Sequence, residues 1–198
     1  MGTAMPKKIL IIDGHPDPDE ARLCHALAKA YWDGAREGGH EVRDIEVARF
    51  DFPILQSLQD YYHGEPCPSI HNAQKDIEWA DHIVIIFPLW MGGMPALLKG
   101  FLEQVLRPGF AYEAKEGGFP GKLLHDKSAR IIVTMGMPAF AYRWFFMAHS
   151  LKNLKRNILK FCGINPVRDT LFGMVEAVSD EKRKGWIEKM RDMGRGGE

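Results

Sequence analysis

The stretch FPLWMGGMP, residues 87–95, joins an apolar run to a helical pattern through residue types that suit contact with a flat ligand. Pro88 would stop strand pairing, and the glycine pair that follows would let the backbone approach a ligand closely. Trp90 and Met91 offer broad, polarizable surfaces to a planar ring. The alternative is that both side chains only fill the core, which is the commoner situation for Trp and Met. A site for a planar aromatic ligand explains all of these choices.

A second loop, GHPDPDEARLCH at residues 14–25, follows the β-branched run KKILIID and precedes a helical pattern. The start of a helix favours a phosphate, because its first N–H groups are unpaired and the helix dipole is positive there. His15 and Arg22 could add charge-assisted hydrogen bonds. The alternative needs no ligand, since Asp17 would cap the helix and Glu20 would complete a capping box. The residues of this loop leave both interpretations open.

A third loop, VTMGMPAFAY at residues 133–142, again places a hydroxyl and a glycine at the end of a strand pattern. Thr134 and the neighbouring backbone N–H groups would address the carbonyl and ring-nitrogen edges of the same ligand. Other fingerprints are absent from the sequence: GxxxxGK[ST], GxGxxG after the first strand, and GxSxG. Nucleoside triphosphate hydrolysis, a Rossmann dinucleotide site and a nucleophile elbow are therefore disfavoured.

Apolar runs alternate with helical patterns along the whole chain, which predicts an α/β fold. The predicted strands are 7–13, 40–47, 82–87, 129–135 and 166–175, and the predicted helices are 22–37, 73–81, 95–106, 150–163 and 179–193. Two irregular segments, 48–72 and 107–128, interrupt the alternation. No repeat or linker divides the chain, so we expect one doubly wound, five-stranded parallel sheet with helices on both faces. Such sheets bind ligands outside the carboxyl ends of their strands, where the three loops would meet.

Composition narrows the class of protein further. The chain of 198 residues has 26 basic and 26 acidic side chains, so no overall field favours nucleic acid or a membrane surface. The three cysteines lack CxxC spacing, which indicates a reducing, cytoplasmic compartment. His63, Cys67 and His71 have metal-binding side chains, but the prolines among them break helical spacing, and no metal site is predicted. Residues 1–6 are interpreted as a leader and 7–198 as a single domain, and no apolar run reaches the ~20 residues of a membrane span.

Several motifs resemble one known family: GHPDP after the first strand, FPLWMGGMPALLKGFLEQVL after the third, GFAY, VTMG with Tyr142 beyond it, and ILKFCG. They resemble the flavodoxin-like NAD(P)H quinone oxidoreductases, which include DT-diaphorase and the ancillary oxidoreductases of bacterial potassium efflux systems. The resemblance covers about residues 7–175, and FPLWxxxMPAxLKG is its most specific part. It implies a flavodoxin-like sheet with strand order 2-1-3-4-5.

The resemblance also implies a noncovalently bound flavin, with its phosphate on the first loop, its ring against the second and its pyrimidine edge near the third. FMN is preferred to FAD because the chain is short, while the 48–72 segment could cover the adenosine of FAD. The cofactor-binding residues that it implies are His15, Arg22, Leu23, Cys24, Pro88, Leu89, Trp90, Met91, Thr134, Met135, Gly136, Met137 and Tyr142. Phe110 and Tyr112 would line the substrate side, across the interface of a homodimer.

The activity that the resemblance implies is NAD(P)H:quinone oxidoreduction, in which NAD(P)H gives a hydride to the flavin and a quinone-like acceptor then takes its place in a ping-pong cycle. Tyr142 and His149 match the catalytic Tyr and His of the family, with a one-residue difference in spacing to His149. Arg22 stands before Leu23 where the family commonly has Ser, and TMGM replaces Thr-Thr-Gly-Gly at 134–137.

The alternative function is a flavodoxin-like regulatory or ancillary subunit of a membrane transporter with incidental turnover. The aromatic segment 140–151 distinguishes the two, because it would bind a second copy of the chain in the first case and the transporter in the second.

Overall fold

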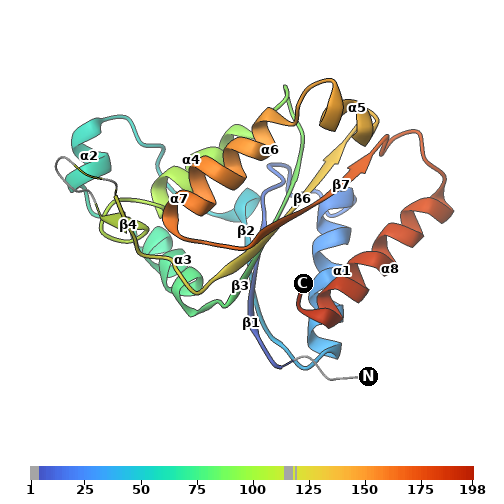
Figure 1. The fold of residues 1–198 in the computed structure, drawn as a ribbon, viewed down its shortest axis with the longest axis horizontal. Coiled ribbons are helices and arrows are strands. Elements are labelled where there is room, and N and C mark those ends of the chain that lie inside the picture. The colour runs from blue at the N-terminus through green and yellow to red at the C-terminus, as the bar shows by residue number, and fades with distance from the viewer. Residues whose placement is uncertain (1–4, 114–117, 119) are drawn as a thin grey trace.

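The fold is built around a five-stranded parallel sheet (Figure 1), here described from a computed structural model for residues 5–113, 118 and 120–198. The strand order is β2-β1-β3-β6-β7, which confirms the predicted order. The strands are β1 (Lys8–Asp13), β2 (Glu41–Glu46), β3 (His82–Pro88), β6 (Ser128–Met135) and β7 (Val167–Gly173). β1, β3 and β6 are almost wholly buried because helices cover both faces, as their unbroken apolar runs predict.

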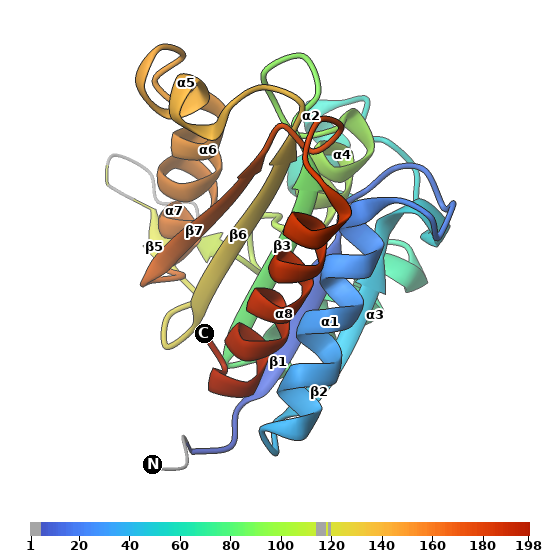
Figure 2. The same cartoon turned by 90° about the vertical axis from the view of Figure 1, so that its right-hand side faces the viewer.

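Helices pack on both faces of this sheet (Figure 2). One face carries α1 (Leu23–Glu37) and α8 (Asp180–Gly196); the other carries α3 (Pro68–Trp79), α4 (Ala96–Val105) and the continuous run α6 (His149–Asn153), η2 (Leu154–Leu159) and α7 (Lys160–Cys162). α1 and α8 approach so closely that a Cβ on Gly34 would lie 1.9 Å from the carbonyl oxygen of Arg191. Glycine is therefore required where these two helices meet.

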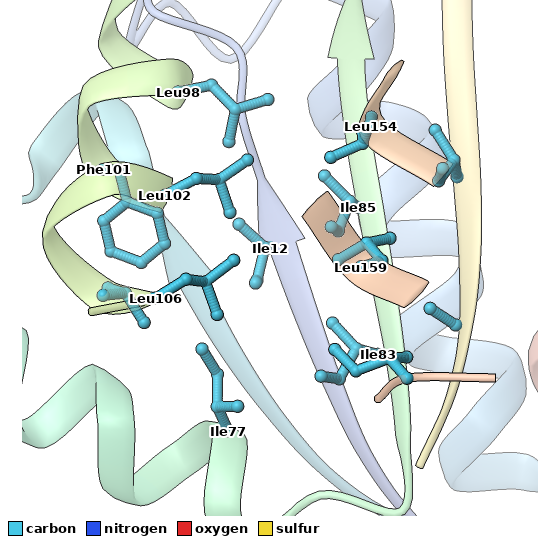
Figure 3. Close-up of a cluster of buried hydrophobic side chains, with 14 of the residues drawn as sticks. Ile12, Ile77, Ile83, Ile85, Leu98, Phe101, Leu102, Leu106, Leu154 and Leu159 are labelled. Carbon is cyan, nitrogen blue, oxygen red and sulfur yellow. The ribbon is translucent and has the colours of Figure 1, made fainter. Parts of the chain in front are cut away.

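The larger of the two cores lies between the sheet and α4 (Figure 3). Leu98 and Leu102 of α4 point toward buried isoleucines of β1 and β3, and leucines of η2 extend this layer. The Phe101 ring packs edge-on against two phenylalanines of the segment that follows η1. Each fully buried Leu, Ile or Phe side chain stabilises the fold by about 1.5–3 kcal/mol relative to exposure. This layer fixes α4, and with it the end of the loop that connects β3 to α4.

Short elements depart from the sequence prediction. α3 begins at Pro68 and not at residue 73, because proline suits the first turn of a helix. The irregular segments contain η1 (Val47–Arg49), α2 (Leu58–His63) and a hairpin of β4 (Tyr112–Glu113) and β5 (Gly121–Lys122), while α5 (Ala139–Trp144) was not predicted. The predicted helix 150–163 begins at His149 and contains the π-helical η2. Residues 1–4 of the predicted leader, and 114–117 and 119 of the second irregular segment, lie outside the described residues.

The described part of the chain has no helix that combines the length and apolar character needed to cross a membrane.

Candidate functional site

The loops after β1, β3 and β6 meet at the carboxyl edge of the sheet, and Thr134 joins them. Its carbonyl oxygen accepts a hydrogen bond from the Leu89 N–H at 2.7 Å, which fixes the loop after β3. Its hydroxyl lies 3.3 Å from the Cys24 sulfur in the first turn of α1. Both side chains are buried, and burial raises the pKa of the Cys24 thiol to about 12. Thr134 thus positions two of the loops, and Cys24 is a packed, unreactive thiol.

The loop after β3 contains a tight two-residue turn, residues 90–93. Trp90 and Gly93 exchange backbone hydrogen bonds of 2.9 and 2.8 Å, and the two residues between them have φ angles of +48° and +77°. Both central residues are therefore left-handed, as in a type I′ turn, where Asn or Gly is the favoured choice. The first of them is Met91, and a non-glycine residue in this left-handed conformation destabilises the fold by about 1–2 kcal/mol. Because the Met91 side chain is fully exposed, packing within the chain does not explain it, and strain of this kind favours a binding role.

Two glycines of the site face open space. A Cβ added to Gly92 or Gly136 would meet no atom of the described residues within 4 Å. Gly14 differs, because a Cβ there would lie 2.6 Å from Cδ2 of Leu98, so its glycine serves packing against α4. The backbone at 92 and 136 is open to a flat molecule, and these loops fit the ring of a flavin.

The first loop leaves the start of α1 without a side-chain cap. α1 begins at Leu23 with Arg22 at the N-cap position, and no side chain of the described residues caps its N–H groups. The capping-box interpretation of Asp17 and Glu20 is therefore wrong, since the helix starts several residues later than it requires. Uncapped N–H groups at a helix start fit a phosphate.

The Arg22 guanidinium forms ion pairs with carboxylates of its own loop. Its Nε donates to the Asp17 carboxylate at 2.8 Å, a second nitrogen lies 2.7 Å from the same group, and Asp19 is 3.5 Å away. A phosphate bound here would compete with these carboxylates for the guanidinium.

Two histidines lie side by side beneath this loop, with ring centres 5.4 Å apart. Nδ1 of His25 is 2.6 Å from the Asp13 carboxylate, and its Nε2 is 2.9 Å from the Asp17 carbonyl oxygen. Burial alone would lower the pKa of His25, but these two acceptors outweigh it and raise the pKa. For His15 burial prevails and lowers the pKa. His25 therefore holds its proton more strongly than His15.

His15 also connects the first loop to the 90–93 turn, because its ring lies edge-on to that of Trp90 at 6.0 Å. Sequence reasoning identified His15 and missed Asp13 and His25. The sequence pattern that could have predicted their pairing is a carboxylate at the end of an apolar strand followed by a histidine in the first turn of the next helix.

Tyr142 and His149 lie at the corner between α5 and α6, in different environments. Tyr142 is buried, and its hydroxyl oxygen accepts the Leu151 N–H at 3.2 Å. Burial raises the pKa of Tyr142, and the bond from Leu151 opposes this. His149 is exposed as the first residue of α6. The structure thus brings the two predicted catalytic residues to one corner, with the phenol turned inward.

Phe110 and Tyr112 do not join the three loops. The Tyr112 hydroxyl is 2.8 Å from that of Tyr61, and its ring packs at 4.9 Å from Phe161. Tyr61, Tyr112 and Phe161 line a separate hollow of about 470 Å³ between α2, α4 and α7, which we call the tyrosine hollow. Within one chain, the predicted substrate-lining residues are therefore apart from the predicted ring site.

The remaining predicted residues belong to the walls of the site. Pro88 and Met135 end β3 and β6 and are buried, while Leu23, Leu89 and Met137 are half-buried. Pro88 pairs with Thr134 at the last position of the β3–β6 ladder.

A doubly wound parallel sheet with the strand order β2-β1-β3-β6-β7 defines a flavodoxin-like α/β protein. The chain belongs to the family described as Flavodoxin-like fold, whose model matches residues 7–193.

Relatives of known sequence carry oxidoreductase names. An uncharacterized NAD(P)H oxidoreductase of Haemophilus influenzae is 35% identical over 184 residues, which cover 90% of each chain. Human ribosyldihydronicotinamide dehydrogenase (quinone) is 33% identical over 142 residues, 67% of this chain and 59% of the human one.

Solved structures show the same architecture. Smu.1420 from Streptococcus mutans superposes with a TM-score of 0.80 at 33% identity, covering 95% of this chain and 98% of that one. The NAD(P)H:quinone oxidoreductase from Methanothermobacter marburgensis gives a TM-score of 0.82 at 23% identity, covering 98% and 100%, a likeness of fold alone.

Proposed function

We propose that the chain is a flavin-dependent NAD(P)H:quinone oxidoreductase. The observation that carries the proposal is the 90–93 turn, which holds Trp90 and a strained, fully exposed Met91 beside open backbone at the ligand-binding edge of the sheet. The names of the relatives from Haemophilus influenzae and human support the same class of activity.

In this proposal FMN is the cofactor and FAD the alternative. The uncapped start of α1, with His15 and Arg22 beside Leu23 and Cys24, would hold the phosphate. The 90–93 turn and Leu89 would support the ring, while the backbone of residues 134–137 would face its pyrimidine edge. The bound flavin would supply a hydride acceptor that NAD(P)H reduces and a quinone reoxidises at one shared position.

The contribution of the chain is orientation and hydrogen bonding. The Thr134 carbonyl oxygen holds the loop after β3 against β6. The Tyr142 hydroxyl oxygen accepts the Leu151 N–H, so its own proton stays available for donation. His149, exposed nearby, would donate a hydrogen bond to negative charge that develops on the substrate.

The proposed assembly is a cytoplasmic homodimer. Because Tyr112 lines the tyrosine hollow and not the loops after β1, β3 and β6, Phe110 and Tyr112 would reach the flavin ring of a second copy. The three cysteines are free thiols, which supports a reducing compartment.

The test is steady-state oxidation of NADPH or NADH with a water-soluble quinone. A shared position predicts parallel lines in double-reciprocal plots, and Trp90→Ala should lower quinone turnover at least tenfold while Trp32→Ala on α1 leaves it nearly unchanged. Intersecting lines, or equal turnover in both variants, would contradict the proposal.

A specific observation also supports the transporter-subunit alternative. Phe140, Phe145 and Phe146 are 71%, 80% and 50% exposed, an apolar surface of the kind that binds protein partners. A mass measurement in solution separates the two, because the enzyme proposal predicts a stable dimer and the alternative predicts a monomer.

A further inference from the structure

A basic hollow of about 410 Å³ lies between α5 and α6, beyond the loop after β6. Its lining includes Arg143, Trp144, Met147, Lys152, Lys155 and Asp169. None of these residues was assigned to the flavin or to the quinone above. The hollow therefore needs its own explanation.

The charges of the basic hollow do not cancel. Asp169 accepts hydrogen bonds from Arg143 at 2.5 Å and from Lys155 at 3.0 Å. Burial alone would raise the pKa of Asp169, but the two cations outweigh it and lower the pKa, so the carboxylate stays ionised at neutral pH. Lys152 adds a third cation that Asp169 does not bind. Three cations against one carboxylate leave an excess of two positive charges, which matches a phosphate monoester.

The surrounding sequence strengthens this field. Residues 127–168 contain eight Lys or Arg and no Asp or Glu, whereas the whole chain has 26 side chains of each sign. Arg130 and Arg168 pair with Glu198 elsewhere, but Lys152, Lys155, Arg156 and Lys160 follow one another on the α6–η2–α7 run beside the basic hollow. A ligand of the basic hollow would therefore be an anion.

An aromatic side chain stands at the rim of the basic hollow. Trp144 is 77% exposed and also borders a neighbouring hollow of about 400 Å³ that Phe140 and Lys189 help to line. An exposed indole next to cations suits a planar base that carries a phosphate, because the base stacks while the phosphate pairs with Lys or Arg.

The position of the basic hollow links it to the redox site. Only residues 136–138 separate Met135, the last residue of β6, from Ala139, the first residue of α5. The basic hollow therefore follows the proposed ring site directly along the chain.

We propose that the basic hollow binds the adenosine 2′-phosphate end of NADPH, and that the protein consequently prefers NADPH to NADH. This inference rests on the proposed function for its catalytic consequence, but the binding itself does not require a flavin. Lys152 is the residue that distinguishes the two nucleotides, because Asp169 already shares Arg143 and Lys155.

The experiment combines kinetics with direct binding. The flavin-loaded wild-type protein should show kcat/KM about tenfold or more higher for NADPH than for NADH, the size of one charge-assisted hydrogen bond. Lys152→Ala should lower kcat/KM for NADPH about tenfold and leave that for NADH within about twofold. Arg156→Ala is the matched control, since Arg156 is an exposed cation of η2 outside the lining of the basic hollow.

Calorimetric titration with 2′,5′-ADP and with 5′-AMP gives a readout independent of turnover. The inference is supported if the wild-type protein binds 2′,5′-ADP more tightly than 5′-AMP and Lys152→Ala loses this preference. This result would support nucleotide binding even if the protein takes up no flavin and the proposed function fails. Equal affinity for the two ligands, or equal loss of NADPH and NADH activity in Lys152→Ala, overturns it. Competition by inorganic phosphate alone as strong as that by 2′,5′-ADP would also overturn it, because the site would then bind a free anion and not the nucleotide.

Discussion

Thr134→Val tests whether the Thr134 hydroxyl positions the loops, as its contact with Cys24 indicates, or binds the flavin, as the sequence predicts. Valine has nearly the same shape, so the variant removes only the 3.3 Å contact with the Cys24 sulfur and keeps the carbonyl that accepts from Leu89. A buried hydrogen bond of this kind stabilises the fold by about 0.5–1.5 kcal/mol. For a chain of this length 1 kcal/mol corresponds to about 2–4 °C, so Tm should fall by about 1–6 °C.

Thermal unfolding and flavin titration together check this prediction. Because the variant keeps the hydrogen bond from the Leu89 N–H to the carbonyl oxygen of residue 134, the loop after β3 stays in place and the flavin Kd should change less than about threefold. Thr170→Val is the control: its hydroxyl accepts from the buried Arg130 at 2.9 Å, and an unsatisfied charged donor costs more, about 1.5–3 kcal/mol. A loss of flavin affinity beyond about tenfold in Thr134→Val, with Tm nearly unchanged, would refute the reasoning and place the hydroxyl on the ring.

Three further predictions concern the turn, the histidines and the helix contact. Met91→Gly should raise the free energy of unfolding by about 1 kcal/mol in urea denaturation, because glycine tolerates the left-handed conformation, and should lower quinone turnover. The pKa of His25 is raised in the folded state, so the stabilisation by its charged form is complete below about pH 6.5 and is lost as the pH rises through the folded pKa. His25→Gln should therefore lower Tm more at about pH 6 than at about pH 8.5. Asp13→Asn should make this difference between the two pH values smaller. Gly34→Ala should destabilise the fold by about 3 kcal/mol or more, because its Cβ would meet the backbone of α8.

Each of these predictions has a contrary result. Unchanged stability in Met91→Gly would show that the turn is not strained. A His25→Gln effect that is independent of pH would remove the charged interaction with Asp13. Gly185→Ala is the control for Gly34→Ala, because a Cβ at Gly185 would meet no described atom within 4 Å. This substitution should stabilise the fold by about 0.5–1 kcal/mol, since alanine restricts the unfolded chain more than glycine does. Equal effects of the two alanines would contradict the close approach of α1 and α8.

The sheet could be predicted because its signals are local and strong. KKILIID, HIVIIF and ARIIVTM each contain a run of consecutive β-branched or other apolar residues, and glycine or proline ends several of the elements between them. Short elements were missed for the opposite reason: α5 has only six residues and an aromatic composition without a clear period. The single domain over 7–198 stays a prediction.

The site was predicted in its location and less well in its contacts. Proline and paired glycines after β3 indicate a turn, but only the φ angles show that Met91 is strained. The contacts of Thr134 with Cys24 and of Asp13 with His25 join separate elements, and no sequence period encodes such pairs. The acidic first loop suggested a helix cap, whereas the structure uses Asp17 to hold Arg22.

Flavin binding is the central claim, and the visible absorption spectrum of freshly purified protein tests it most directly. The account predicts a yellow protein that releases FMN, or FAD, on heating, with identity established by chromatography, and uptake of the same flavin by any colourless fraction. A colourless protein that takes up neither flavin at micromolar concentration would contradict the account.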